Sequence, residues 1–237
     1  MRTPPRVVLT LQRLVAPMSN ETRSALSAAE LAAWPHVFRE AAGGGATEAP
    51  VFVTLHGTGG TEHDIVALAD ALDPSWAVLS PRGRTSENGM NRWFARRGEG
   101  VFDVDDVVVR AGELADFIEW ATASYGLEGR PLVLVGFSNG ANIALATAFL
   151  HPLVAQRAIA FSGMYPFADR RLDARLDSST ILLVGGADDP MAPAPSVATL
   201  VSELERAGAA VTAAHRAGGH GIAAADLERA KEWLAAL

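Results

Sequence analysis

The sequence predicts an α/β fold with a mostly parallel sheet and helices on both of its faces. Short β-rich runs alternate along the chain with longer segments whose apolar residues recur every three or four positions. Several of the runs end in turns that contain glycine or proline, which is typical of strands that pass into the next helix. Strands separated by helices of this length pair in parallel, because the chain returns to the same end of the sheet before each new strand.

In the first half of the chain, strands are expected over residues 51–55 and 76–79. Between them, apolar residues at i, i+3, i+4 and i+7 predict a helix; they are Ile65, Leu68, Ala69 and Leu72. Residues 84–103 form a long irregular stretch without a repeating apolar pattern. Asp105 and Asp106 are then expected to open a helix, since acidic side chains stabilise the positive end of the helix dipole.

The second half repeats the alternation. Strands are expected over residues 132–137, 158–161, 181–184 and 211–214. Residues 141–150 are apolar on nearly every side, which predicts a helix covered by other elements. Amphipathic helices are expected around residues 197–204 and 227–237. Parallel sheets of this kind carry their chemistry at the carboxyl ends of the strands.

The composition excludes several classes of protein. With 49% hydrophobic and 20% charged residues, the chain is typical of a globular protein and not of a disordered one. The 237 residues include no cysteine, which excludes a disulfide scaffold, a thiolate metal site and a cysteine nucleophile. The formal net charge of −7 argues against a nucleic-acid partner, since proteins that bind nucleic acids normally carry a basic excess.

One domain is expected over residues 34–237, after a peripheral N-terminal extension over residues 1–33. The glycine-rich segment 41–46 is expected to be a flexible joint before the first strong strand. A short apolar run near the N-terminus hints at a signal peptide, but Gln12 and Arg13 interrupt it and no convincing cleavage site follows. No apolar run is long enough to span a membrane, so a cytoplasmic location is the expectation.

A candidate nucleophile lies where the strand at 132–137 meets the following helix. The sequence Gly136-Phe137-Ser138-Asn139-Gly140 matches the pattern G-x-S-x-G, in the strand-to-helix context that this motif requires. The turn is so sharp that a Cβ at either glycine would collide with neighbouring elements. Ser138 is therefore expected at the tip of the turn with its hydroxyl exposed. The competing interpretation is an idle serine in a tight turn.

A serine hydroxyl is a poor nucleophile at neutral pH, so a base must take up its proton. In this fold class the acid and then the base follow the nucleophile along the chain, which leaves three of the six histidines. His151 ends the helix after the nucleophile and is better explained as a helix cap. His215 ends a predicted strand, whereas His220 lies in a loop whose glycines let it reach across the strand ends. We prefer His220.

The imidazole in turn needs a carboxylate that fixes its tautomer and stabilises its cation. Asp188 and Asp189 directly follow the strand predicted at 181–184. Pro190 restricts the residue before it to an extended conformation, which makes Asp189 a rigidly held side chain. Asp189 is therefore preferred as the acid. Asp188 is the alternative, with a turn or capping role as its other explanation.

The negative charge of an acyl-transfer intermediate needs N–H donors that are already in place. One donor is expected from the backbone of Asn139, directly after the nucleophile. The other is expected from Thr58, in the glycine-rich loop after the strand at 51–55. His56, at the start of this loop, is expected to hold the loop by hydrogen bonds rather than to act in catalysis. A flexible turn without function is the competing explanation.

Together these segments resemble the α/β-hydrolase superfamily, and within it the small bacterial phospholipase/carboxylesterase family. The resemblance covers about residue 50 to the end. Its landmarks are residues 55–60, 136–140, 186–190 and 219–220. The resemblance implies an α/β-hydrolase fold with a minimal cap and supports Asp189 as the acid of the triad. The segments 82–83 and 87–97 are similar to carboxylesterases associated with quinone and hydroquinone stress. Asn139 replaces a glutamine of thioesterase-like relatives, which favours the esterase subgroup.

Four further side chains are predicted to bind substrate: Trp93, Phe94, Met164 and Met191. Trp93 and Phe94 lie in the stretch 84–103 and are expected to wall an acyl or aromatic pocket, with core packing as the alternative. Met164 and Met191 each follow a strand end. The arginines at 92, 96 and 97 either attract an anionic substrate or form a solvated basic face. The aspartates at 103, 105 and 106 are explained by helix capping rather than by a metal site.

The predicted function is a serine carboxylesterase that hydrolyses small, short-acyl esters through an acyl-enzyme intermediate and needs no cofactor. A small-molecule ester is the expected partner, and a homodimer is compatible with the sequence. A lysophospholipase or acyl-thioesterase would use the same triad with a long acyl groove, whereas the stretch 84–103 is mostly polar. Dienelactone-type hydrolases normally carry cysteine in place of Ser138. A non-catalytic small-molecule receptor on the same scaffold is the alternative from another class.

Overall fold

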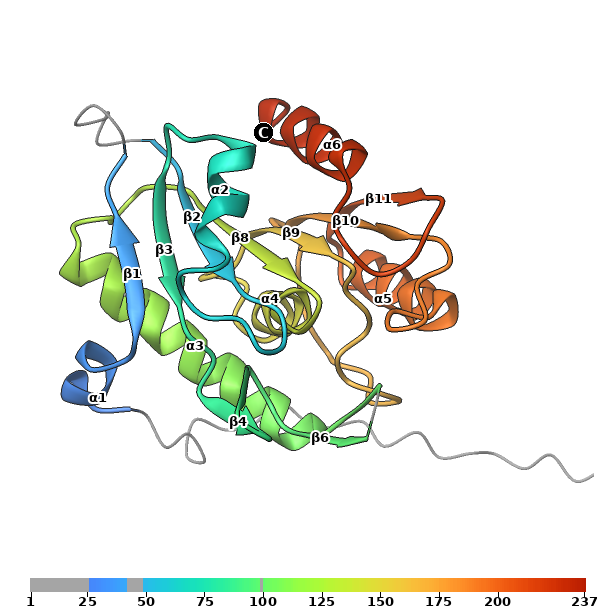
Figure 1. Ribbon diagram of the computed structural model, residues 1–237, viewed down its shortest axis with the longest axis horizontal. Coiled ribbons are helices and arrows are strands. Elements are labelled where there is room, and N and C mark those ends of the chain that lie inside the picture. Colours follow the sequence, from blue (N-terminus) through green and yellow to red (C-terminus); the bar gives the residue numbers. More distant parts are fainter. Residues whose placement is uncertain (1–25, 42–48, 99) are drawn as a thin grey trace, which may run out of the picture.

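The computed structural model describes residues 26–41, 49–98 and 100–237. Its centre is a seven-stranded sheet in the order β1-β3-β2-β8-β9-β10-β11 (Figure 1). The strands are β1 (His36–Arg39), β2 (Val51–Leu55), β3 (Ala77–Pro81), β8 (Leu132–Phe137), β9 (Arg157–Phe161), β10 (Thr180–Gly186) and β11 (Ala210–Arg216). β1 runs antiparallel to β3, and the other neighbouring pairs are parallel. The prediction of a mostly parallel sheet is confirmed.

Helices cover both faces of this sheet, as predicted, and each face has its own hydrophobic cluster. One face carries α1 (Ala28–Ala32), α3 (Val104–Ser124), α4 (Asn139–Leu150) and α5 (Ala194–Arg206). The other carries α2 (Val66–Leu72) and α6 (Ala224–Ala235) (Figure 1). Adjacent residues of β2 alternate between the clusters: Val51 and Val53 join the first, and Phe52 joins the second. This alternation follows because successive side chains of a strand point to opposite faces.

Two helices confirm specific sequence predictions. α4 is buried along residues 139–149, since it lies between the sheet and α3. α3 begins after Asp103, whose side chain accepts a hydrogen bond from the N–H of Asp106. Asp103 therefore caps the helix, as expected, and Asp105 and Asp106 lie in its first turn.

The N-terminal part of the domain differs from the prediction. Strand β1 was not predicted, because its four residues are all half-buried and show no alternation of apolar and polar positions. Helix α1 belongs to the assigned extension, yet Leu31 is 7% exposed and joins the core of the first face. The folded domain thus begins before residue 34. The rest of the predicted extension, residues 1–25, and the predicted joint beyond Ala41 lie outside the described residues.

The stretch predicted to be irregular contains two small antiparallel hairpins. β4 (Thr85–Glu87) pairs with β5 (Met90–Arg92), and β6 (Arg96–Gly98) pairs with β7 (Val101–Phe102). Strands of two or three residues are too short to show a period in the sequence. In Figure 1 these hairpins lie beside the N-terminal half of α3, away from the main sheet.

Gly140, in the first turn of α4, tolerates no side chain. A Cβ placed there would overlap the backbone carbonyls of Leu55 and His56 at the end of β2. We expect Gly140→Ala to lower the free energy of unfolding by about 3 kcal/mol, because two packed backbones have to separate. Denaturant unfolding measures this loss. Gly98→Ala is the control, since a Cβ at Gly98 meets no atom within 4 Å; equal losses in both variants would contradict the close approach.

Candidate active site

Ser138 lies at the turn between β8 and α4, at the carboxyl edge of the parallel strands. Its φ of 54° and ψ of −114° place it in a sparsely populated backbone region for a residue with a side chain. Its N–H donates to the carbonyl of Phe161 at 2.9 Å, and its carbonyl accepts from the N–H of Asn142 at 3.0 Å. A Cβ at Gly136 would overlap the backbone of Gly140. The turn therefore has the geometry of a nucleophile elbow.

His220 and Asp189 form a hydrogen-bonded pair. Nδ1 of His220 lies 2.8 Å from Oδ2 of Asp189, whose side chain is 1% exposed. The other carboxylate oxygen accepts hydrogen bonds from the N–H groups of Met191 and Ala192, at 2.8 and 3.2 Å. Burial opposes ionisation of Asp189, but the hydrogen bonds from His220 and from the backbone outweigh burial and lower the pKa of the carboxyl group. Asp189 is thus a charged and fixed acceptor for the imidazole N–H.

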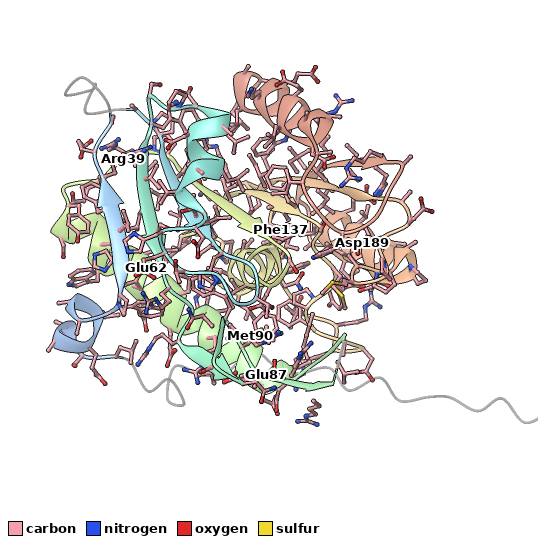
Figure 2. All side chains as sticks on the ribbon, in the orientation of Figure 1. Arg39, Glu62, Glu87, Met90, Phe137 and Asp189 are labelled. Atoms are coloured by element: carbon pink, nitrogen blue, oxygen red, sulfur yellow. The ribbon has the colours of Figure 1, made fainter. Side chains whose placement is uncertain are left out.

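The imidazole of His220 also lies close to the elbow. Its ring centroid is 5.0 Å from that of Phe137, the residue directly before Ser138. In Figure 2, Phe137 and Asp189 lie along the same edge of the sheet. The Ser138 hydroxyl makes no hydrogen bond to any residue that the structure describes. The structure therefore brings the His220 ring to the neighbour of Ser138 without joining the two side chains.

The two alternative residues, His215 and Asp188, do not form such a pair. His215 is exposed on β11, and its side chain makes no hydrogen bond or ion pair within the described part of the chain. Asp188 is exposed, and within the described residues its carboxylate accepts only a long hydrogen bond from the N–H of Gly218, at 3.4 Å. The imidazole–carboxylate contact is made by the two residues that the sequence analysis preferred.

The loop after β2 is held by His56, which is 1% exposed. Nε2 of His56 accepts a hydrogen bond from the N–H of Gly83 at 2.9 Å, so Nδ1 carries the proton and donates to the carbonyl of Gly57 at 2.7 Å. Burial lowers the pKa of His56, which keeps the ring neutral, as these two bonds require. The predicted structural role of His56 is confirmed.

The predicted oxyanion donors, the N–H groups of Thr58 and Asn139, lie at this same edge. Asn139 is the first residue of α4, so its N–H has no acceptor within the helix. The N–H of Thr58 has no acceptor among residues 26–41, 49–98 and 100–237. A Cβ at Gly57 would lie 3.0 Å from the Phe137 ring, so the loop packs directly against the elbow.

Two asparagines of α4 attach neighbouring loops to the elbow. Oδ1 of Asn139 accepts from the N–H of Trp93 at 2.8 Å, and Oδ1 of Asn142 accepts from the N–H of Met164 at 2.8 Å. Nδ2 of Asn139 is buried and has no partner in the described residues. Sequence reasoning missed Asn142; its signal was an amide side chain in an otherwise apolar helix, three residues after Asn139 and thus near the same face.

The four predicted substrate contacts fall into two groups. Trp93 and Phe94 are 2% and 0% exposed and belong to the hydrophobic core. This packing favours the alternative assignment, core packing, because side chains with so little exposed surface offer little contact to a substrate. Met164 is largely buried as well, at 8% exposed, whereas Met191 is 46% exposed two residues after Asp189.

The arginines of the hairpins do not form a solvated basic face. Arg92 is buried, at 3% exposed. Arg96 donates to the carboxylate of Glu87 at 2.9 Å, and the exposed Arg97 lies 3.4 Å from the carboxylate of Asp103. Each of the outer two arginines therefore has an acidic partner, and the inner one belongs to the packed interior.

Two features are absent from the described residues. No group of three or more histidine, aspartate or glutamate side chains there is arranged to hold a metal ion. Within the same residues, no helix combines the length and the apolar character that a membrane span requires.

Comparison with known proteins points to one family. The model of the phospholipase/carboxylesterase family matches residues 40–237. MhqD of Bacillus subtilis (strain 168), which is provisionally named a hydrolase, is 37% identical over 183 residues, or 77% of this chain and 91% of MhqD. The crystal structure of the Bacillus cereus carboxylesterase has a TM-score of 0.80 at 36% identity, over 86% of this chain and 94% of that one. A carboxylesterase from Mesorhizobium loti has a TM-score of 0.73 at 29% identity, over 81% and 90%.

Proposed function

The chain belongs to the phospholipase/carboxylesterase family of α/β-hydrolases, and on this premise we propose that it is a serine carboxylesterase for small, short-acyl esters. The observation that carries the proposal is the 2.8 Å contact between His220 Nδ1 and Asp189 Oδ2, beside the turn that carries Ser138. A serine becomes a nucleophile when an imidazole can take its proton and a carboxylate holds that imidazole in the correct tautomer.

In the proposed reaction, Oγ of Ser138 attacks the ester carbonyl while Nε2 of His220 takes up the serine proton. Asp189 keeps the proton on Nδ1, so Nε2 is free to act as the base, and its charge stabilises the imidazolium. The imidazolium then protonates the departing alcohol, and an acyl group remains on Ser138. A water molecule, deprotonated by His220, hydrolyses this acyl-enzyme and releases the carboxylic acid. None of these steps requires a cofactor.

Each tetrahedral intermediate carries a negatively charged oxygen. We propose that the backbone N–H groups of Thr58 and Asn139 donate hydrogen bonds to this oxygen. Two observations support this assignment: neither N–H has an acceptor among the described residues, and the loop that carries Thr58 packs against Phe137. The positive end of the α4 dipole adds to the attraction. A fixed donor in such a position typically lowers the barrier by about 3 kcal/mol.

A short acyl group is supported by the mostly polar character of residues 84–103, which fold against the loop after β2 through the hydrogen bond from the N–H of Gly59 to the carbonyl of Asn91. Two exposed methionines lie close to proposed site residues: Met90, 39% exposed, beside Gly59, and Met191, 46% exposed, two residues after Asp189. A long acyl chain would therefore lie mostly in water.

We expect kcat/KM for p-nitrophenyl esters to peak at acyl chains of about two to six carbons, since each CH₂ contributes roughly 0.8 kcal/mol only while it is buried. The measurement is a series from acetate to palmitate, with a fluorophosphonate to count reactive serines. A profile that rises steadily to long chains, or turnover of lysophospholipids, would instead indicate a lysophospholipase or acyl-thioesterase. A folded protein with neither turnover nor fluorophosphonate labelling would be a non-catalytic binding protein.

A further inference from the structure

The segment Asn91–Trp93 holds the glycine-rich loop after β2. The carbonyl of Asn91 accepts a hydrogen bond from the N–H of Gly59 at 2.8 Å, and its Nδ2 donates to the carbonyl of Gly60 at 3.0 Å. The loop is thus fixed from the side of the β4–β5 hairpin, at the two residues that directly follow Thr58.

Trp93 connects the same segment to both sides of the proposed oxyanion site. Its Nε1 donates to the carbonyl of His56 at 2.8 Å, and its backbone N–H donates to Oδ1 of Asn139 at 2.8 Å. The indole ring also packs on the His56 ring, with centroids 5.1 Å apart. The hairpin therefore fixes the loop after β2 and the start of α4 relative to each other.

Between these anchors lies Arg92, a buried cation. Its Nη1 donates to Oγ1 of Thr58 at 3.0 Å, and its Nε donates to the carbonyl of Phe94 at 3.3 Å. Its carboxylate partner, Glu87, is 3.4 Å away and is shared with Arg96 at 2.9 Å. Burial first, and then the neighbouring Arg96, lowers the pKa of Arg92, as expected of a cation whose charge is incompletely compensated.

The contact with Arg92 determines what the Thr58 hydroxyl can do. A hydroxyl has one proton and two lone pairs, and an arginine can only donate, so Oγ1 of Thr58 is the acceptor in this contact. Its own proton is therefore turned away from Arg92. No described residue accepts that proton, and Thr58 is exposed. Thr58 thus keeps a free O–H donor, in the loop whose backbone N–H is assigned to the oxyanion.

We propose that the Thr58 hydroxyl is a third donor to the oxyanion, and that Arg92 is the positioning residue that orients and polarises it. The inference rests on the proposed function, because it needs Ser138 to generate the oxyanion. A hydrogen bond from a cation strengthens the donor character of the hydroxyl that accepts it. The buried guanidinium also acts at lower effective dielectric than a surface charge. Arg92 would then stabilise part of the negative charge that develops on the substrate, because it polarises the Thr58 hydroxyl that donates to that charge.

The test compares variants that remove the hydroxyl with variants that keep it. Thr58→Val keeps the shape and removes the donor, and we expect kcat to fall by on the order of 10²-fold with little change in KM. Thr58→Ser keeps the donor and should stay within a few-fold of the natural protein. Arg92→Met should lower kcat similarly, and Arg92→Lys, which can still donate, should recover much of the loss.

The double variant Thr58→Val with Arg92→Met separates a relay from two independent effects. If Arg92 acts through Thr58, the double variant should be no slower than the slower single variant. Losses that multiply would overturn the relay. Arg97→Met is the matched control, because Arg97 is exposed and lies outside these contacts; its kcat should not change.

A second measurement covers a failure of Arg92→Met to fold. A trifluoromethyl ketone, which forms a tetrahedral adduct with the serine, should bind to Thr58→Val weaker by the same factor by which kcat/KM falls. Unchanged inhibitor affinity and unchanged kcat in Thr58→Val would overturn the inference. If Ser138→Ala is inactive in that case, the proposed esterase mechanism still stands. If Ser138→Ala retains full activity, the proposed function itself fails.

Discussion

Replacement of Ser138 by alanine is expected to lower kcat for ester hydrolysis by about 10⁴- to 10⁶-fold, because the reaction loses its nucleophile. The fold should stay intact, since the substitution removes only an oxygen that makes no hydrogen bond within the described residues. Fluorophosphonate labelling should disappear with the activity. Turnover of a short p-nitrophenyl ester and the thermal unfolding midpoint of the same preparation check both statements.

Ser162 provides the matched control for this experiment. It also follows a strand, β9, and also has a positive φ, of 52°. In the part of the chain that the structure describes, its hydroxyl makes only a long hydrogen bond to the carbonyl of Gly221, at 3.4 Å. Ser162→Ala should therefore change kcat by less than about 10-fold. A large loss in Ser162→Ala together with an active Ser138→Ala would move the nucleophile to β9 and contradict the elbow.

The main sheet could be predicted from sequence because its strands are buried on both faces. Runs such as Leu132–Phe137 are apolar throughout and are separated by helices with clear periodicity. β1 carries neither signal: its residues are half-buried, and it pairs antiparallel at the sheet edge. A sequence pattern reports burial, so an edge strand with mixed exposure gives little to detect.

The candidate residues could be proposed because the carboxyl ends of parallel strands meet along one edge. That rule predicts residues 138, 189 and 220 at the same edge although up to 82 positions separate them in the numbering. The glycines at 136 and 140 added a steric argument, which the close backbone contacts support. The strand-end rule, the G-x-S-x-G motif and the order of the residues along the chain together carried the assignment.

The hairpin contacts could not be predicted, because they depend on how a polar segment folds back over the strand ends. The sequence is compatible with Trp93 as a pocket wall or as a core residue. Only the structure shows that its indole N–H donates to the carbonyl of His56. In the sequence, Arg92 looks like one of three surface arginines, and only the structure shows its contact with Thr58. Polar contacts between distant segments leave no periodic trace in either segment.

Disruption of the His220–Asp189 pair is the second large effect that we expect. His220→Ala should lower kcat nearly as much as Ser138→Ala, because the serine then lacks a base. Asp189→Asn should lower kcat by about 10⁴-fold, since an amide can present N–H where the imidazole needs an acceptor. His215→Ala and Asp188→Asn are the matched controls and should be mild, because neither residue contacts the pair through a hydrogen bond.

A double variant makes this prediction specific. The variant that combines His220→Ala with Asp189→Asn should be no slower than His220→Ala alone, because Asp189 acts only through the imidazole. Losses that multiply would show that Asp189 has a separate role. A strong loss in His215→Ala would place the base on β11, at the end of the strand rather than in the loop that follows it.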